Sequence, residues 1–334
     1  MHGWLIIDKP VGPGSTQIVS AVKRALREGG YPKVKVGHGG TLDPLASGVL
    51  PIALGEATKL AARMLDADKA YQFTIGFGAE TSSLDAEGEV VATSDVRPTM
   101  ADVEAVLPRF TGPIEQVPPA YSALKVEGKR AYDLARAGVE FELRARCVTV
   151  HQLKILPGTG RGTATRSAVV EGGPKPAVRM ESPLHHAAHG PPPRPGEDQV
   201  TLQARVSKGT YIRSLARDIA RALGTVGHVT MLRRTKAGPF TLDAAITLDK
   251  LAELGKARTL EQALLPLTAG LDDIPALLVT PDQASALRQG RKLVGIAAKP
   301  GLHLAIDGSV PVALVEFDGG ELRPELRVVR GFNL

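Results

Sequence analysis

The chain has little of several features that would point to a function by themselves. Its 334 residues include a single cysteine, Cys147, which excludes an intramolecular disulfide framework and a cysteine-based zinc site. No apolar run is long enough for a membrane span, and the one near the N-terminus, residues 3–7, is too short for a signal peptide. These absences predict a soluble, cytoplasmic protein without a membrane partner.

What the chain does have is enough apolar residues for a large core and a modest positive charge. The hydrophobic fraction is 43%, and the length predicts one large domain plus a smaller one. The formal net charge is +6. Such a charge favours a polyanionic partner such as nucleic acid, although proteins without one often carry it too.

One glycine-rich stretch, residues 37–51, stands out as the organising element. It contains four glycines and two prolines around a single acid, Asp43, which is followed by Pro44. Glycine at this density indicates unusual backbone dihedrals or the close approach of another group. Two interpretations of Asp43 fit the local chemistry: a carboxylate that acts in a site, or a helix N-cap with proline at the first helical position.

Periodicity predicts an alternation of strands and helices along the rest of the chain. Apolar alternation predicts strands over 3–8, 69–77, 148–156 and 200–206. Helical spacing and caps predict five helices. The first begins at Ser15 or Thr16, the second ends at about 65, and the third follows a Thr99/Asp102 capping box. The fourth covers 131–136, and the fifth runs from Thr210 to Gly224. A helical connector over 247–265 and short strands with Asp-Gly turns at 307–308 and 318–319 predict a small β-rich module at the end.

Residues 157–198 differ in composition from the rest. They show little periodicity, many Gly, Pro, Ser and Thr residues, and a proline-rich run at 190–196, which together predict a disordered insertion. His185, His186 and His189 fall inside it without cysteine or acidic ligands at useful spacing. A flexible linker therefore explains them better than a metal site.

A cluster of cations marks the helix expected after Thr210. Arg213, Arg217 and Arg221 follow at i, i+4 and i+8, and Asp218 is the one acid between residues 205 and 236. Clustered cations indicate phosphate contacts better than global charge does. The alternative is a helix with a solvent-exposed arginine face.

Five stretches occur in a fixed order: Leu5–Pro10, Gly37–Leu50, Gly55–Lys59 with Lys69–Tyr71, Tyr121–Lys125 and Ser207–Arg213. Together they resemble the bacterial TruB-type pseudouridine synthases, which modify uridine 55 in the T-loop of tRNA. The resemblance covers nearly the whole chain except 157–198. It implies an α+β fold in which a mixed, largely antiparallel sheet forms a catalytic domain over 1–250. A connector helix and a PUA-like RNA-binding domain would follow over 251–334.

The resemblance also implies roles for matching residues. Asp43 would be the catalytic aspartate, Tyr71 would stack on the target base and handle protons, and Arg213 would pair with Asp43. Tyr211, Lys59 and Leu232 would line the base pocket, and His38 would contact RNA displaced as the base is extruded. Many members have an acid after the first proline–glycine breaker, where this chain has Gln17.

The implied reaction agrees with what the sequence has. Conversion of uridine to its C-glycoside breaks the N-glycosidic bond, rotates the uracil and rejoins it through C5, which requires no cofactor or metal. A carboxylate can attack the anomeric carbon or remove a proton from the adjacent carbon, and the sequence leaves both routes open. The expected partner is the T-arm of tRNA, with no protein partner and a monomeric enzyme. The rival hypotheses are a non-catalytic RNA-binding protein or tRNA chaperone, and an RNA methyltransferase, for which no methyl-donor loop is evident.

Overall fold

A large sheet forms the body of the molecule. The computed structural model describes residues 1–122, 124–126, 128–157, 198–318 and 325–334. The eleven strands of this sheet are β1 (Gly3–Lys9), β2 (Val36–His38), β3 (Ser47–Leu54), β4 (Lys69–Phe77), β7 (Gly112–Gln116), β10 (Arg146–Ile155), β11 (Gln199–Val206), β12 (Gly227–Ala237), β13 (Phe240–Thr241), β14 (Ala245–Ile246) and β15 (Leu265–Pro266). Their main order is β14-β1-β3-β12-β4-β11-β10-β7. Most neighbours are antiparallel, so the expected mixed, largely antiparallel architecture is confirmed.

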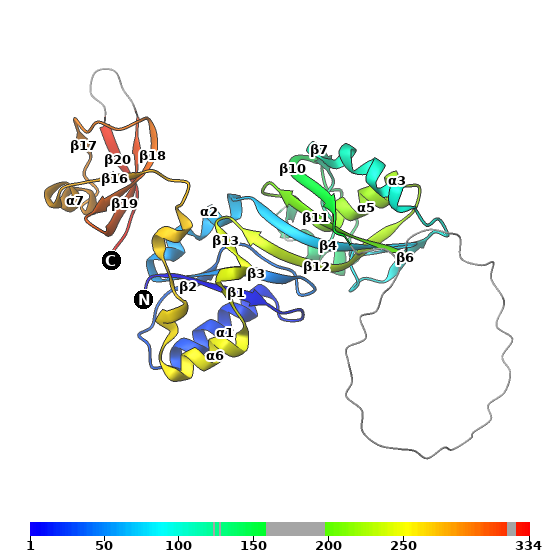
Figure 1. Cartoon of the computed structure of the whole chain (residues 1–334), viewed down its shortest axis with the longest axis horizontal. Coiled ribbons are helices and arrows are strands. Elements are labelled where there is room, and N and C mark those ends of the chain that lie inside the picture. Colours follow the sequence, from blue (N-terminus) through cyan, green and yellow to red (C-terminus); the bar gives the residue numbers. More distant parts are fainter. Residues whose placement is uncertain (123, 127, 158–197, 319–324) are drawn as a thin grey trace, which may run out of the picture.

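A second, separate sheet of five strands lies at the other end of the molecule (Figure 1). It contains β16 (Ala276–Leu278), β17 (Leu293–Val294), β18 (Gly301–Asp307), β19 (Val310–Phe317) and β20 (Glu325–Gly331). Two small hairpins complete the strands: β5 (Ala79–Thr81) with β6 (Val90–Thr93), and β8 (Lys125–Val126) with β9 (Lys129–Arg130). The Asp-Gly turn expected at 318–319 reaches beyond the described residues.

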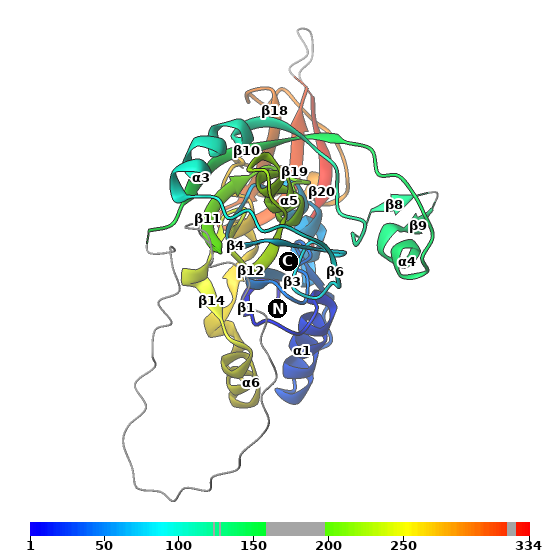
Figure 2. The ribbon, with the colours of Figure 1, turned by 90° about the vertical axis from the view of Figure 1, so that its right-hand side faces the viewer.

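Seven α-helices lie among the described residues. They are α1 (Ser15–Glu28), α2 (Ala61–Asp66), α3 (Met100–Val106), α4 (Ala131–Arg136), α5 (Ile212–Ala222), α6 (Leu248–Ala257) and α7 (Pro281–Arg288), with the short 3₁₀ helices η1 (Gly55–Leu60), η2 (Leu107–Phe110), η3 (Leu242–Ala244), η4 (Leu260–Ala263) and η5 (Leu267–Gly270). Helices α1 and α6 lie side by side below β1, and α5 packs against β12 and β4 (Figures 1 and 2). Helix α7 packs on the smaller sheet, and α4 contacts β9 of the small hairpin. None of these described helices is long and apolar enough to cross a bilayer.

Most predicted elements are confirmed with small shifts of their ends. The Thr99/Asp102 capping box forms, with the Asp102 N–H donating to Thr99 Oγ1. Helix α5 begins at Ile212, and its N-cap is Tyr211 rather than Thr210. The inner strand β12 was not anticipated, because Arg233, Arg234 and Lys236 interrupt the apolar alternation that would have marked it.

Two hydrophobic clusters hold the layers together. In the first, α1 and α5 bury Ile18, Val22, Leu215 and Ile219 against the large sheet. The second runs from Trp4 in β1 to residues of the smaller sheet and its C-terminal tail, Leu304, Leu314 and Phe332, all at most 4% exposed. Because this core is shared, burial of apolar area docks the C-terminal module on the body.

The two halves of the large sheet meet beside the glycine-rich stretch. There β12 runs parallel to β3 for only two residue pairs, Arg233 with Ser47 and Arg234 with Gly48. Gly48 has φ +103°, and a Cβ at this position would lie 2.1 Å from the Arg234 carbonyl oxygen. Only glycine therefore fits this position, which brings the loop that carries Asp43 onto the middle of the sheet.

Candidate active site

Asp43 lies in the loop between β2 and β3. No helix follows it; Pro44 and Leu45 form a turn before β3, so the helix N-cap interpretation is wrong. Backbone hydrogen bonds tie the loop down, with the Gly12 N–H donating to the Pro44 carbonyl at 2.9 Å and the Ala46 N–H to the Asp43 carbonyl at 3.1 Å. The Asp43 side chain is 42% exposed, so a substrate can reach it.

Arg213 from α5 faces this carboxylate and a second one. Its Nη2 lies 2.8 Å from Asp43 Oδ2, and its Nη1 lies 3.2 Å from Asp85 Oδ2. The same two nitrogens donate to the Ser83 carbonyl at 2.9 Å and the Tyr121 carbonyl at 3.0 Å. The guanidinium is 7% exposed and the Asp85 side chain 3%. Both terminal nitrogens of this buried cation therefore have an ionic and a hydrogen-bonding partner, which fixes its orientation.

A second guanidinium supports the loop from below. Arg234 is 1% exposed and donates to three carbonyls of the glycine-rich stretch, Val49 at 2.8 Å and Thr41 and Gly40 at 3.2 Å. Burial and the Arg234 charge lower the pKa of His38 below its usual value, so the imidazole is neutral at neutral pH. His38 thus presents an uncharged ring beside the loop.

One cavity of about 810 Å³ contains most of the predicted site. Six of the seven site residues expected from the sequence line it: His38, Asp43, Tyr71, Tyr211, Arg213 and Leu232. Tyr71 enters from β4 and Leu232 from the neighbouring β12, where the sheet register pairs Phe73 with Leu232. Residues that lie far apart in the chain therefore converge on one space beside the Asp43 carboxylate.

Lys59 is the expected residue that does not line this cavity. It lies in η1, where its Nζ pairs with Glu56 Oε2 at 2.7 Å and donates to the Gly331 carbonyl at 2.8 Å. The Asn333 N–H donates to the same Glu56 oxygen at 2.9 Å. Lys59 thus binds the end of the smaller sheet to the body, because the C-terminal tail folds back onto η1.

The arginine ridge on α5 is used for contacts within the protein. Besides Arg213, Arg217 pairs with Asp218 at 2.8 Å and donates to the Val117 carbonyl, and Arg221 pairs with Glu80 at 2.8 Å. Arg213 and Arg217 are therefore largely buried, whereas Arg221 is 57% exposed, and phosphate binding by this row stays a prediction. Exposed cations reach the cavity from another direction, the β8–β9 hairpin, through Lys125 and Arg130.

Sequence reasoning missed two polar residues of the site. Asp85 lies in an irregular segment after β5, and a lone acid there carries no periodic signal. Lys69 was seen only as part of a motif, yet it lines the cavity, and its buried Nζ donates to the Leu65 and Ala67 carbonyls at 2.6 Å each. Burial lowers the pKa of Lys69 to about 8. One signal could have found it: Lys69 and Tyr71, two residues apart, share a strand face.

The arrangement combines an exposed carboxylate, a buried guanidinium that orients it, and a phenol ring in a space large enough for a nucleoside. A fixed carboxylate of this kind can serve as a nucleophile or a general base. The predicted insertion with His185, His186 and His189 lies almost entirely outside the described residues, and no group of potential metal ligands occurs among those that are described.

Comparison with known proteins gives matches along the full chain. A family model described as TruB family pseudouridylate synthase (N terminal domain) matches residues 24–173, and one described as tRNA pseudouridylate synthase B C-terminal domain matches residues 213–272. The tRNA pseudouridine synthase B of Novosphingobium aromaticivorans is 59% identical over 100% of this chain and 98% of its own length. That of Zymomonas mobilis is 56% identical, over 100% and 96%. A solved Cbf5-Nop10-Gar1 complex contains a chain of the same fold, with a TM-score of 0.65 and 25% identity over 99% of this chain and 84% of that one.

Proposed function

The chain belongs to the TruB family of pseudouridine synthases and isomerises uridine to pseudouridine in tRNA, and we propose that Asp43 is the carboxylate that acts on the ribose. The observation that carries this proposal is the 2.8 Å ion pair between Asp43 and Arg213 inside the cavity that Tyr71 also lines. The ion pair leaves the Asp43 carboxylate 42% exposed, so it can contact substrate while its partner stays buried.

The isomerisation requires few chemical groups besides this carboxylate and its guanidinium partner. The N-glycosidic bond breaks, the uracil rotates, and C5 joins the anomeric carbon while its proton moves to the nitrogen that was released, so atoms balance without a co-reactant. Attack of Asp43 on the anomeric carbon and proton removal from the adjacent carbon both need a carboxylate held in one orientation. Arg213 supplies that orientation, since its other contacts are fixed by Asp85 and two carbonyls.

The target base must leave its stack before the ribose can be reached. Tyr71 and Leu232 offer an aromatic and an aliphatic surface on adjacent strands, which would replace the stacking that the base loses. The Tyr71 phenol, which lines the same cavity, would also handle the C5 proton. Tyr211 would close the pocket, and neutral His38 would contact the displaced RNA without adding charge.

The RNA would approach past the β8–β9 hairpin, where Lys125 and Arg130 line the cavity. We propose the T-arm of tRNA, with its uridine 55, as the part that is bound. We also propose that the protein acts as a monomer, because one copy of the chain brings Asp43, Tyr71 and Arg213 to the same cavity. The five-stranded sheet would be the PUA-like RNA-binding module. A catalytic domain over 1–250, a connector and C-terminal domain over 251–334, and a cytoplasmic location stay predictions.

The test is the product map of an unmodified tRNA transcript. Wild-type protein is expected to form pseudouridine at position 55, and Asp43→Asn to form none while tRNA affinity changes by less than about threefold. Asp249→Asn, at an exposed position on α6, is the matched control and should remain active. Turnover by Asp43→Asn would overturn the assignment of the carboxylate. Tight tRNA binding by wild-type protein without product would favour a non-catalytic RNA-binding protein.

A further inference from the structure

A buried amide outside the cavity fixes the segment that delivers Arg213. Gln116, the last residue of β7, is 1% exposed. Its Oε1 accepts the Tyr211 N–H at 2.7 Å, and its Nε2 donates to the Tyr211 carbonyl at 3.1 Å. An amide that exchanges both bonds with one residue reproduces the pairing of neighbouring strands, so the Tyr211 backbone is held from two points.

Arg146 lies directly opposite Gln116 in the sheet and holds the same segment. The register of β7 with β10 pairs these two residues, so their side chains share a face. The Arg146 guanidinium lies 4.9 Å from the centroid of the Tyr211 ring and donates to the Gly209 carbonyl at 2.7 Å. Gln116 thus hydrogen-bonds to the Tyr211 backbone, while Arg146 packs on the Tyr211 ring.

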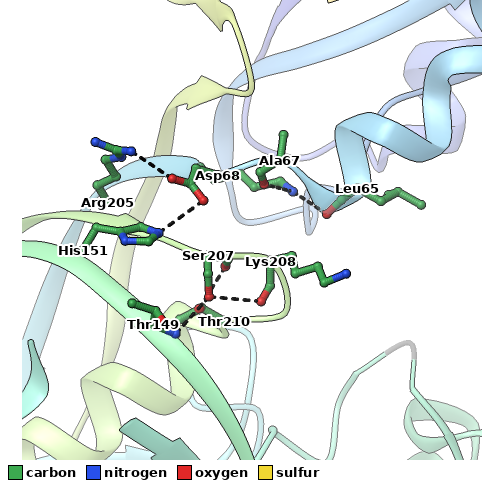
Figure 3. Close-up of polar contacts among 10 residues, drawn as sticks. Leu65, Ala67, Asp68, Thr149, His151, Arg205, Ser207, Lys208 and Thr210 are labelled. Carbon is green, nitrogen blue, oxygen red and sulfur yellow. Dashed lines mark hydrogen bonds and ion pairs between the residues drawn. The ribbon is translucent and has the colours of Figure 1, made fainter. Parts of the chain in front are cut away.

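Side-chain hydrogen bonds also hold the turn before Tyr211. Thr210 Oγ1 donates to the Ser207 carbonyl at 3.0 Å, and the Thr149 N–H donates to Ser207 Oγ at 2.9 Å (Figure 3). The chain therefore enters α5 from a fixed turn, passes the Gln116 amide, and reaches Arg213 two residues later.

Helix α5 is attached to the same strand end on its other side. Ser214 Oγ donates to the Val117 carbonyl at 2.8 Å. Arg213 thus lies between two attachments to consecutive residues, Gln116 and Val117. A shift of the Tyr211 backbone would move the base of the Arg213 side chain, and with it the partner of Asp43.

We propose that Gln116 is a positioning residue for the isomerisation, which holds the Tyr211 backbone and thereby sets where Arg213 meets Asp43. The inference rests on the proposed roles of Asp43 and Arg213. Gln116 does not line the cavity, so it acts through Tyr211 and Arg213 and not on the substrate. Its loss should slow the chemical step more than it weakens tRNA binding, since a misplacement of about 1 Å can cost about a hundredfold in rate.

Two substitutions separate positioning from a general structural role. Gln116→Met keeps the length of the side chain and removes both hydrogen bonds. Gln116→Glu restores the amide's pattern only when the new carboxyl is protonated, because a neutral carboxyl has one O–H donor and one carbonyl acceptor. Burial and the facing Tyr211 carbonyl favour the neutral form of the new carboxyl, whereas the Arg146 guanidinium opposite it and the Tyr211 N–H favour the charged form. The charged form, which has no donor for the Tyr211 carbonyl, therefore predominates at the high end of the pH range. Gln152→Met, an exposed change on β10, is the matched control.

The readout is the single-turnover rate of pseudouridine formation, the tRNA dissociation constant and the thermal midpoint, each relative to wild type between about pH 5.5 and about pH 8. We expect Gln116→Met to lose about tenfold or more in rate at every pH, with affinity within about threefold. Gln116→Glu should recover towards wild type as the pH falls and lose rate as it rises. Gln152→Met should match wild type throughout.

Each outcome bears on the proposal. A wild-type rate for Gln116→Met, or a wild-type rate for Gln116→Glu at about pH 8, where its carboxylate has no donor for the Tyr211 carbonyl, would overturn it. If Gln116→Met fails to fold, the rate of Gln116→Glu at about pH 8 still decides. Failure of the proposed function is recognised separately, since Asp43→Asn would then turn over whatever Gln116 does.

Discussion

The Ser15 hydroxyl exchanges two hydrogen bonds with the backbone of Leu42, the residue before Asp43. Its oxygen accepts the Leu42 N–H at 2.8 Å and donates to the Leu42 carbonyl at 3.0 Å. Ser15 is 4% exposed and opens helix α1, so the loop that carries the carboxylate is fixed to a helix in the core. One buried polar side chain therefore holds the backbone one residue before Asp43, and another holds the backbone two residues before Arg213.

Removal of this hydroxyl should loosen the Asp43 loop. Ser15→Ala leaves the Leu42 N–H and carbonyl buried without a partner, and we expect the free energy of unfolding to fall by about 1–3 kcal/mol. The single-turnover rate should fall by about tenfold because the carboxylate samples wrong orientations. Denaturant titration and single-turnover assays measure the two effects. Ser20→Ala, which removes an exposed hydroxyl bonded only within α1, is the control and should change neither.

Asp85 is the second partner of Arg213, and its loss should be costly. Asp85→Asn removes the charge of a carboxylate that is 3% exposed, which leaves the buried guanidinium with Asp43 as its single counter-ion. Breaking a buried pair costs about 3–5 kcal/mol, so lower stability and a rate reduced by about tenfold or more are expected, with tRNA affinity little changed. Glu253→Gln breaks an exposed pair with Lys250 on α6 and should be neutral. Wild-type activity in Asp85→Asn would show that Arg213 needs only Asp43.

The sequence predicts the site better than it predicts the contacts that hold it. Asp43 could be found because its glycine-rich loop and its resemblance to a family are both local, continuous signals. The bonds from Ser15 to Leu42 and from Gln116 to Tyr211 span 27 and 95 residues, and no periodic pattern encodes which pair will meet. Lone polar residues of this kind are recognised only once the strands are in register.

Strands that have charged residues at positions facing the core were not predicted, for a related reason. In β12 the buried Arg234 is satisfied by carbonyls of a distant loop, so a position that reads as surface from its residue type lies in the core. The same limit applies to Lys59, since its partner at Gly331 comes from the other end of the chain. Where apolar alternation is clean, as in β4, the predicted range 69–77 and the strand Lys69–Phe77 coincide.

Lys59→Met should affect the docking of the C-terminal tail rather than the base pocket. The substitution removes the ammonium that joins Glu56 to the Gly331 carbonyl. Since the Lys59 side chain is 31% exposed, solvent screens the pair, and the free energy of unfolding should fall by about 1 kcal/mol or less. Amide hydrogen exchange in β20 and at Asn333 should become faster, while the single-turnover rate on a T-arm hairpin RNA stays at the wild-type value. Lys256→Met, at an exposed position, is the control. A tenfold loss of rate in Lys59→Met with unchanged hydrogen exchange would contradict this prediction and favour a role for Lys59 in the base pocket.

The buried amine of Lys69 should give a pH-dependent stability. Its pKa is lowered by burial from 10.5 to about 8, so between these values the unfolded chain keeps a proton that the folded chain has lost. The free energy of unfolding of wild type, relative to Lys69→Met, should therefore rise with pH across this window, by at most about 1.4 kcal/mol per pH unit. Denaturant titrations at several pH values measure the difference. The exposed Lys154→Met should show no such trend, and a flat difference for Lys69→Met would contradict the lowered pKa.

The strands that flank residues 158–197 are already joined as a hairpin, which predicts that this segment can be replaced. Strand β10 runs antiparallel to β11, with Ile155 opposite Leu202, and the Leu156 N–H donates to the Thr201 carbonyl at 2.9 Å. A short Asn-Gly turn can therefore close the two strands.

Deletion of 158–197 with such a turn should leave the single-turnover rate within about threefold of wild type. The thermal midpoint should hold or rise, because each halving of a loop recovers about 0.6 kcal/mol. A matched variant that keeps the segment but breaks the Arg97–Asp198 ion pair, Arg97→Met, separates the loss of this anchor from the loss of the segment. If the deletion alone abolished activity while the fold persisted, residues 158–197 would have a part in the reaction or in binding tRNA.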